Sequence, residues 1–166
     1  MHKLHEDQER FHTLSLDTEQ YLDFLDPYIG ELAAMNLPKR NMPITEYWKP
    51  VNFKLNKNNE DATEAPDWSF YTAGNLILNE KAKTALEPIL AEVGEILPLQ
   101  SDAGQYYFFN CLVKYESGEA LPADKALFKA SPSIGIDLIC SDTFKQAVSD
   151  ADLQGMYFTS DIEALV

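Results

Sequence analysis

All three histidines of the chain lie within its first twelve residues, with two glutamates between them. His2 and His5 are three positions apart, and Glu9 or His12 is a candidate for a further ligand. Imidazole and carboxylate groups are ordinary zinc ligands. A metal site needs a rigid frame, however, and chain ends usually fray. We therefore expect a solvated terminus and no bound metal.

Other reaction chemistries find less support. The seven glycines are scattered singly, so there is no glycine-rich phosphate loop, and no Gly-x-Ser-x-Gly turn occurs. Cys111 and Cys140 stand inside apolar runs, where a free thiol acts as a small hydrophobe, so we expect reduced core cysteines. With 27 acids, carboxylate pairs are plentiful, and a small enzyme using two of them across a cleft is one alternative. We expect no catalytic residue and no cofactor.

The charge of the chain is one-sided. Thirteen Lys and Arg stand against 27 Asp and Glu, a net charge of −14, and residues 61–166 carry −11 of it. Such a potential disfavours nucleic acid, whose phosphates attract Lys and Arg. It favours a basic protein partner, although acidity alone also keeps a protein soluble. A homodimer and a general regulatory module stay open as alternatives.

The candidate contact residues are acids in three predicted turns or loops, together with the tryptophan that follows the first of them. Most aromatic residues next to apolar runs belong to a core, but Trp68 directly follows an acidic loop, and we expect it to be partly exposed. Each acidic cluster alone is most simply a solvated loop, so only their sum indicates a binding surface. The candidates are Glu60, Asp61, Glu64, Asp67, Trp68, Glu116, Glu119, Asp150 and Asp152.

Two stretches 62 residues apart repeat one pattern, and they provide the frame for these side chains. Residues 76–86 and 138–148 each read as a short buried strand, a capping residue (Asn79, Ser141), an acid, and apolar positions at helical spacing. The repeat predicts two strand–helix–strand units, at about 75–99 and 134–158. Pro88 predicts a kink or two short helices in the first unit, and Pro98 predicts an edge strand.

The remaining pattern predicts a few further elements. We expect the strand at 106–113 to be central because it is apolar on both faces. Pro27 must end or kink the helix that begins after Asp17. The other expected elements are strands at 11–16, 51–55 and 126–128, a short helix at 31–35 and a polar loop at 57–67.

These elements predict one α+β domain over residues 1–166, with a mixed β-sheet covered by helices mainly on one side. It has a possible N-terminal subregion at 1–56, an acidic loop at 57–67 and a repeat-bearing region at 68–166. No run of 18 apolar residues occurs, and the first residues are charged, without the apolar stretch of a secretory signal. We expect a cytoplasmic protein that does not contact membranes.

Residues 68–160 resemble a family of bacterial immunity proteins from polymorphic-toxin and contact-dependent competition systems. The most specific pieces are Gly-Glu-x-Leu-Pro-Leu and the terminal Leu-x-Gly-x-x-Phe. The resemblance rests on an ordered set: Leu76-Ile77-Leu78 before a helix, Gly94-Glu95-Ile96-Leu97-Pro98-Leu99, Tyr106-Tyr107-Phe108-Phe109-Asn110, Leu127-Phe128, Leu138-Ile139-Cys140-Ser141-Asp142-x-Phe144, and Leu153-x-Gly155-x-x-Phe158. The first 60 residues show no resemblance.

This resemblance implies a small α+β protein without catalysis, which blocks a cognate toxin of its own or a sibling cell. It transfers no catalytic residue, because the matching positions look like scaffold. An acidic protein suits a toxin that attacks nucleic acid, since it can occupy a basic cleft by mimicking phosphates. A toxin with another target would not require that acidity.

Overall fold

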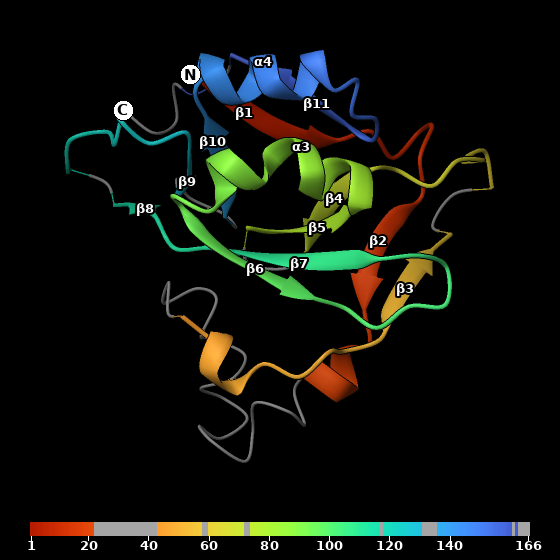
Figure 1. Cartoon of the computed structure of the whole chain (residues 1–166). Coiled ribbons are helices and arrows are strands. Elements are labelled where there is room, and N and C mark those ends of the chain that lie inside the picture. Colours follow the sequence, from red (N-terminus) through yellow and green to blue (C-terminus); the bar gives the residue numbers. More distant parts are fainter. Residues whose placement is uncertain are drawn as a thin grey trace.

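The computed structural model describes residues 1–21, 43–57, 60–71, 74–116, 118–130, 136–160 and 162. It has the mixed α+β fold that the sequence predicts, but its strands form three sheets (Figure 1). The elements are β1 (His2–Glu6), β2 (Thr13–Leu16), η1 (Thr45–Tyr47), β3 (Phe53–Asn56), β4 (Trp68–Tyr71), β5 (Asn75–Asn79), α3 (Glu80–Leu90), β6 (Gly94–Pro98), β7 (Tyr106–Cys111), β8 (Lys114–Tyr115), β9 (Leu127–Ala130), β10 (Asp137–Cys140), α4 (Asp142–Asp150) and β11 (Met156–Thr159).

The two strand–helix–strand units are present as predicted, β5–α3–β6 and β10–α4–β11. The side-chain oxygen of Asn79 accepts the Ala82 N–H at 2.9 Å, and that of Ser141 accepts the Phe144 N–H at 3.2 Å. Each bond satisfies one backbone donor that the first helical turn leaves without a partner. The local sequence therefore fixes where both helices begin.

The strand order shows that the repeat extends beyond these units. In the four-stranded sheet the order is β4-β5-β7-β6, and in the five-stranded sheet it is β11-β1-β10-β9-β8. In the first sheet β7 lies antiparallel between β5 and β6. In the second, β1 lies antiparallel between β10 and β11. In the five-stranded sheet, β1 therefore lies between the two strands of a repeat unit, as β7 does in the four-stranded sheet.

This position corrects the expectation of a frayed N-terminus. Residues 2–6 form an inner strand, held by backbone hydrogen bonds on both sides, and they belong to the sheet of the C-terminal repeat rather than to a subregion at 1–56. The sequence conceals the strand because Leu4 is its only fully buried side chain, at 2% exposure. The partners of β1 lie about 135 or more residues away, so local patterning does not reveal them.

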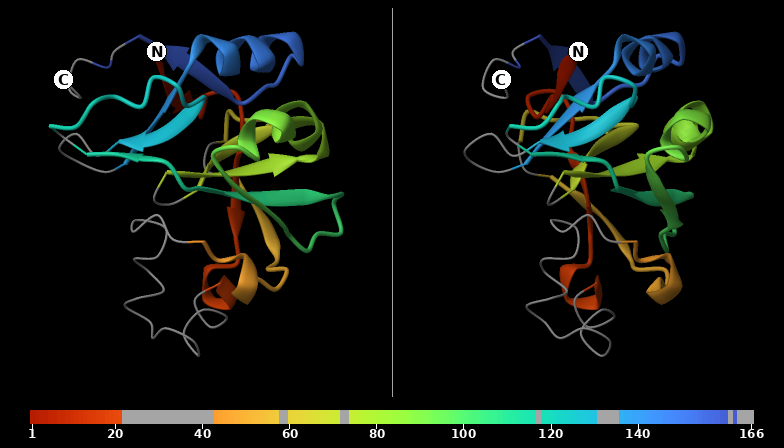
Figure 2. Two further views of the ribbon diagram at one scale, coloured as in Figure 1. Left: turned by 60° about the vertical axis from the view of Figure 1, so that its left-hand side comes forward. Right: turned by 90° about the vertical axis from the view of Figure 1, so that its left-hand side faces the viewer.

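The main core joins the inner faces of the two larger sheets with both helices, which contact each other and lie on one side of the molecule (Figure 2). A second core covers the other face of the four-stranded sheet, where Ile77 and Phe108 meet β2 and residues 44–51. As expected, β7 is central and β6, with Pro98, is an edge strand. The fold is therefore one packed body.

Glu95 on β6 fastens the segment around η1 to the four-stranded sheet. Its carboxylate accepts the backbone N–H groups of Ile44 and Thr45 at 3.0 and 3.2 Å, the Thr45 hydroxyl, and the Asn110 amide at 3.0 Å. Burial alone would raise the pKa of Glu95, but these hydrogen bonds outweigh it and lower the pKa. A carboxylate from a distant strand thus caps this short helix.

Two local expectations have different outcomes. Asp17 does begin a helix, since its Oδ1 accepts the Gln20 N–H at 3.1 Å, but the predictions for Pro27 and residues 31–35 lie outside the described residues. Of the two outcomes predicted for Pro88, two short helices is wrong, because α3 continues to Leu90. Pro88 is exposed near the end of the helix, where water can satisfy the carbonyl that loses its N–H partner.

Candidate interaction surface

Backbone hydrogen bonds bring three acidic segments to one end of the molecule. The Asp7 N–H donates to the Gly155 carbonyl at 3.0 Å, joining the turn after β1 to the start of β11. The Thr63 N–H donates to the Arg10 carbonyl at 3.3 Å, and the Asp67 N–H donates to the Gln154 carbonyl at 2.8 Å. We call residues 6–10, 60–67 and 150–154 together the acidic end. It lies beside β1 and β11, on the right in Figure 1.

The acidic end carries more than half of the net charge of the protein. Its three segments hold nine acidic residues and one basic residue, a net charge of −8 out of −14. The acids are Glu6, Asp7, Glu9, Glu60, Asp61, Glu64, Asp67, Asp150 and Asp152. Such a concentration of one sign creates a potential that attracts a basic surface over a Debye length of about 10 Å at 0.1 M salt.

The structure brings together only some of the acids that the sequence proposes. Glu60, Asp61 and Glu64 lie with Asp150 and Asp152 in the acidic end. Glu116 and Glu119 follow β8, which forms the opposite edge of the five-stranded sheet from β11. Lys114 pairs with Glu116 at 2.7 Å, and this hydrogen bond lowers the pKa of that carboxyl. These two acids therefore do not share one surface with the others.

Asp67 holds the two repeat units together. Its carboxylate accepts the Asn79 side-chain amide at 2.7 Å and the Gln154 backbone N–H at 2.8 Å, and Lys81 lies 3.5 Å away. The Asp67 carbonyl also accepts the Asn79 N–H at 2.8 Å. The side chain is only 16% exposed. Asp67 thus connects the start of α3 to the segment after α4, and its oxygens are engaged within the protein.

The expectation of partial exposure at Trp68 is wrong, since the side chain is 0% exposed. Its ring lies in the main core, tilted against Phe144 at 5.8 Å and Phe158 at 6.3 Å between ring centroids. Trp68 begins β4, so its neighbour Asp67 marks the end of the loop. The tryptophan joins the cores of both units and offers nothing to a partner.

Tyr157 is the aromatic residue that the sequence reasoning missed. It is 50% exposed on β11, where His5 stacks on it at a centroid distance of 5.0 Å and an interplanar angle of 13°. An open hollow of about 470 Å³ next to it is lined by Glu6, Asp7, Gln8, Glu9 and Tyr157. The signal in the sequence was the alternation in Met-Tyr-Phe-Thr, which places Tyr157 and Thr159 on the face opposite the core.

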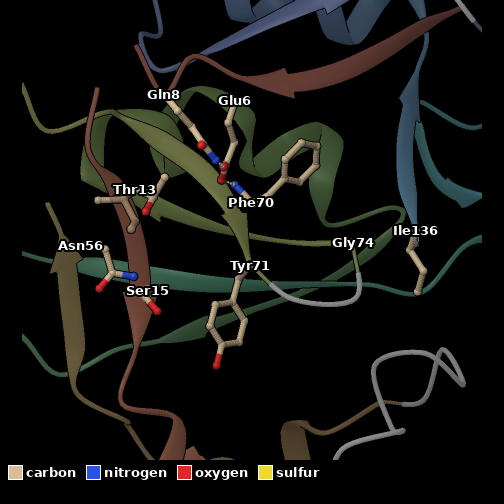
Figure 3. Close-up of a pocket in the computed structure, with 10 residues that line it drawn as sticks. Glu6, Gln8, Thr13, Ser15, Asn56, Phe70, Tyr71, Gly74 and Ile136 are labelled. Carbon is tan, nitrogen blue, oxygen red and sulfur yellow. Dashed lines mark hydrogen bonds between the residues drawn. The ribbon is translucent and has the colours of Figure 1, made fainter. Parts of the chain in front are cut away.

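A second hollow, of about 400 Å³, runs between β2, β4 and the end of β1 (Figure 3). Glu6 lies at the boundary between the two hollows. One of its oxygens accepts the Phe70 N–H of β4 at 2.8 Å, and the other accepts the Gln8 side-chain amide at 2.6 Å. Both carboxylate oxygens are therefore engaged, and the bond to Phe70 holds the edge of β4 to β1.

The terminal histidines take part in separate contacts. His2 bonds to Asp142 in the first turn of α4 at 2.5 Å, and this contact lowers the pKa of Asp142. His5 bonds to the Thr159 hydroxyl at 2.8 Å, and His12 is buried. Among the residues with described positions, no group of three His, Cys, Asp or Glu could hold a metal ion.

The cysteines lie in the core as predicted, buried and not in a disulfide. Burial raises the pKa of the Cys111 thiol, and it raises the pKa of Cys140 to about 12. Since the thiolate is the nucleophile, burial holds both groups in the unreactive form at neutral pH.

Within the described ranges, no helix has both the length and the apolar character that crossing a membrane requires. A comparison of the chain with protein-family models gives no match, and neither does a comparison with curated proteins.

Proposed function

We propose that the protein is a non-catalytic immunity protein that binds and neutralises a cognate bacterial toxin. The observation that carries the proposal is the acidic end, where three segments distant in sequence concentrate a charge of −8 beside an exposed tyrosine. The resemblance of residues 68–160 to immunity proteins supplies the class of partner. The negative charge of the acidic end indicates that this partner is basic.

Charge of this kind acts mainly on the rate of association. Complementary potentials raise association rate constants from about 10⁵–10⁶ to as much as 10⁸–10⁹ M⁻¹s⁻¹ at low salt. An immunity protein must reach a new toxin molecule before the toxin reaches its target, so fast capture is useful. The exposed acids of the acidic end are the ones expected to steer the partner. Asp67 is excluded from that role because it holds the repeat units together.

The test is capture followed by rescue. The tagged full-length protein is incubated at low salt with lysate from its native host, and the bound proteins are identified. We expect one stoichiometric basic protein, which stops growth when it is expressed alone and permits growth when it is co-expressed with this chain. Absence of a partner that is toxic in this way would overturn the proposal.

A further inference from the structure

The edges of the three sheets differ in how they are protected against pairing with another strand. Natural edge strands carry charges, prolines or covering groups that prevent such pairing. In β4 the Phe70 N–H is occupied by the Glu6 carboxylate. β6 ends in Pro98, β3 contains Lys54, and β8 is two residues long and contains Lys114.

Within β11 itself the described residues carry none of these devices; the segment at Asp67 covers this edge only before the strand, at Gln154. The sequence of β11, Met-Tyr-Phe-Thr, contains no charge and no proline, and it includes Tyr157, the more exposed of the two large exposed hydrophobic residues in the described part of the chain. Among the strands that the structure describes, β11 pairs with β1 alone. Because Asp7 donates to Gly155 and hydrogen-bonded pairs alternate along an antiparallel ladder, the backbone N–H groups of Met156 and Phe158 point away from β1.

The charge around β11 indicates what would pair there. The hollow lined by Glu6, Asp7, Gln8, Glu9 and Tyr157 lies next to β11, on the side of β1. A second copy of the chain would bring its own charge of −14 to this surface, so self-pairing is disfavoured. An extended segment with Lys or Arg side chains has the matching sign, and a cation over the tyrosine ring gains further attraction.

We propose that β11 accepts an extended basic segment of the partner as an added strand, with a Lys or Arg side chain placed on Tyr157, where the acids of the neighbouring turn attract it. This inference rests on the proposed function for the identity of the partner. The main-chain hydrogen bonds of Met156 and Phe158 give the strand its register, and Tyr157 gives it selectivity for a cation.

The first experiment uses the full chain and two synthetic peptides, acetyl-Lys-Val-Arg-Val-Lys-Val-amide and acetyl-Glu-Val-Glu-Val-Glu-Val-amide. Amide hydrogen exchange is followed by NMR with each peptide at millimolar concentration. We expect the basic peptide to slow exchange at Met156 and Phe158 at least tenfold, and the acidic peptide to have no effect. Unchanged exchange at these two amides, or equal protection by both peptides, would overturn the proposal.

The second experiment compares Tyr157→Lys with Leu55→Lys, a matched control at the other exposed hydrophobic position. Both variants gain one positive charge, and both should fold because the side chains are partly exposed. We expect Tyr157→Lys to weaken peptide and toxin binding roughly tenfold or more, and Leu55→Lys to change it less than twofold.

The two proposals fail in different ways. If the toxin binds wild type and Tyr157→Lys equally, the function stands and the edge proposal is wrong. If neither protein captures a toxin while the basic peptide still protects Met156 and Phe158, the edge is a basic-strand acceptor and the immunity function is wrong.

Discussion

Replacing Asp67 with alanine separates a structural role from the binding role that its place in the acidic loop predicts. The substitution removes the acceptor of the Asn79 side-chain amide and of the Gln154 N–H. Both donors lie in a part-buried site that joins the two repeat units. We therefore expect Asp67→Ala to lower the free energy of unfolding rather than to act on a partner alone.

The size of the effect follows from these contacts. A hydrogen bond to a charged group contributes about 1.5–3 kcal/mol, and a half-exposed ion pair such as that with Lys81 contributes less than about 1 kcal/mol. Because water can replace part of these hydrogen bonds, we expect Asp67→Ala to lower the free energy of unfolding by about 2–4 kcal/mol. For a chain of 166 residues this corresponds to a decrease in Tm of about 5–15 °C.

Urea unfolding followed by circular dichroism measures this change, with Glu60→Ala as the control. Glu60 is an exposed acid of the same loop, so its replacement should change the unfolding free energy by less than about 0.5 kcal/mol. Asp67→Asn should also destabilise, because the amide keeps one acceptor oxygen but turns an NH2 donor toward the second donor. If Asp67→Ala is as stable as Glu60→Ala, the assignment of Asp67 as the connection between the units is wrong.

Three further predictions concern stability. In thermal unfolding, Gly155→Ala should lower Tm by several degrees more than Gly104→Ala. Both glycines have φ near +120°, but a Cβ at Gly155 would lie 2.3 Å from Pro66, whereas a Cβ at Gly104 would face open space. Folding lowers the pKa of Glu95, so the stabilisation that this carboxylate contributes is complete above the ordinary carboxyl pKa and is lost as the pH falls through the lowered pKa. Glu95→Gln should therefore flatten the acid side of the curve of unfolding free energy against pH. An unchanged curve would refute this role of Glu95. Burial lowers the pKa of Lys129 to about 8, so at this residue the unfolded chain binds more protons than the folded one between pH 8 and the ordinary lysine value of 10.5, and the contribution of Lys129 to stability rises with pH in that window; Lys129→Met should therefore make the slope of unfolding free energy against pH less positive there than in wild type in urea titrations, and an unchanged slope would refute it.

The sequence predicts the elements whose signals are local. Asn79 and Ser141 each cap a helix because a short side-chain oxygen reaches the backbone three residues on, and this needs no information from elsewhere. The strand at β7 was recognisable because it is apolar on both faces and lies in the middle of its sheet.

The features that the sequence does not predict depend on pairing between distant residues. β1 has one fully buried side chain, Leu4, so nothing in its pattern marks it as an inner strand. Trp68 and Asp67 follow an acidic run typical of a solvated loop, yet the segment after α4 covers them. The acidic end could be predicted in part, because its charges are visible in the sequence but the grouping of its three segments is not.

The most direct test of the proposed function compares two matched charge reversals in binding to the captured toxin. The first variant carries Glu9→Lys, Glu60→Lys and Asp150→Lys, one exposed acid from each segment of the acidic end. The control carries Glu116→Lys, Glu119→Lys and Asp124→Lys, three exposed acids that follow β8, so both variants have the same net charge. Association rate constants are measured by stopped flow at 20 and 300 mM salt.

We expect the acidic-end variant to associate about tenfold or more slowly than the control at low salt, and to lose most of its dependence on salt. The control should keep a salt dependence close to that of wild type. Equal rates for the two variants at low salt would contradict the account, because the location of the charge would then have no effect on capture.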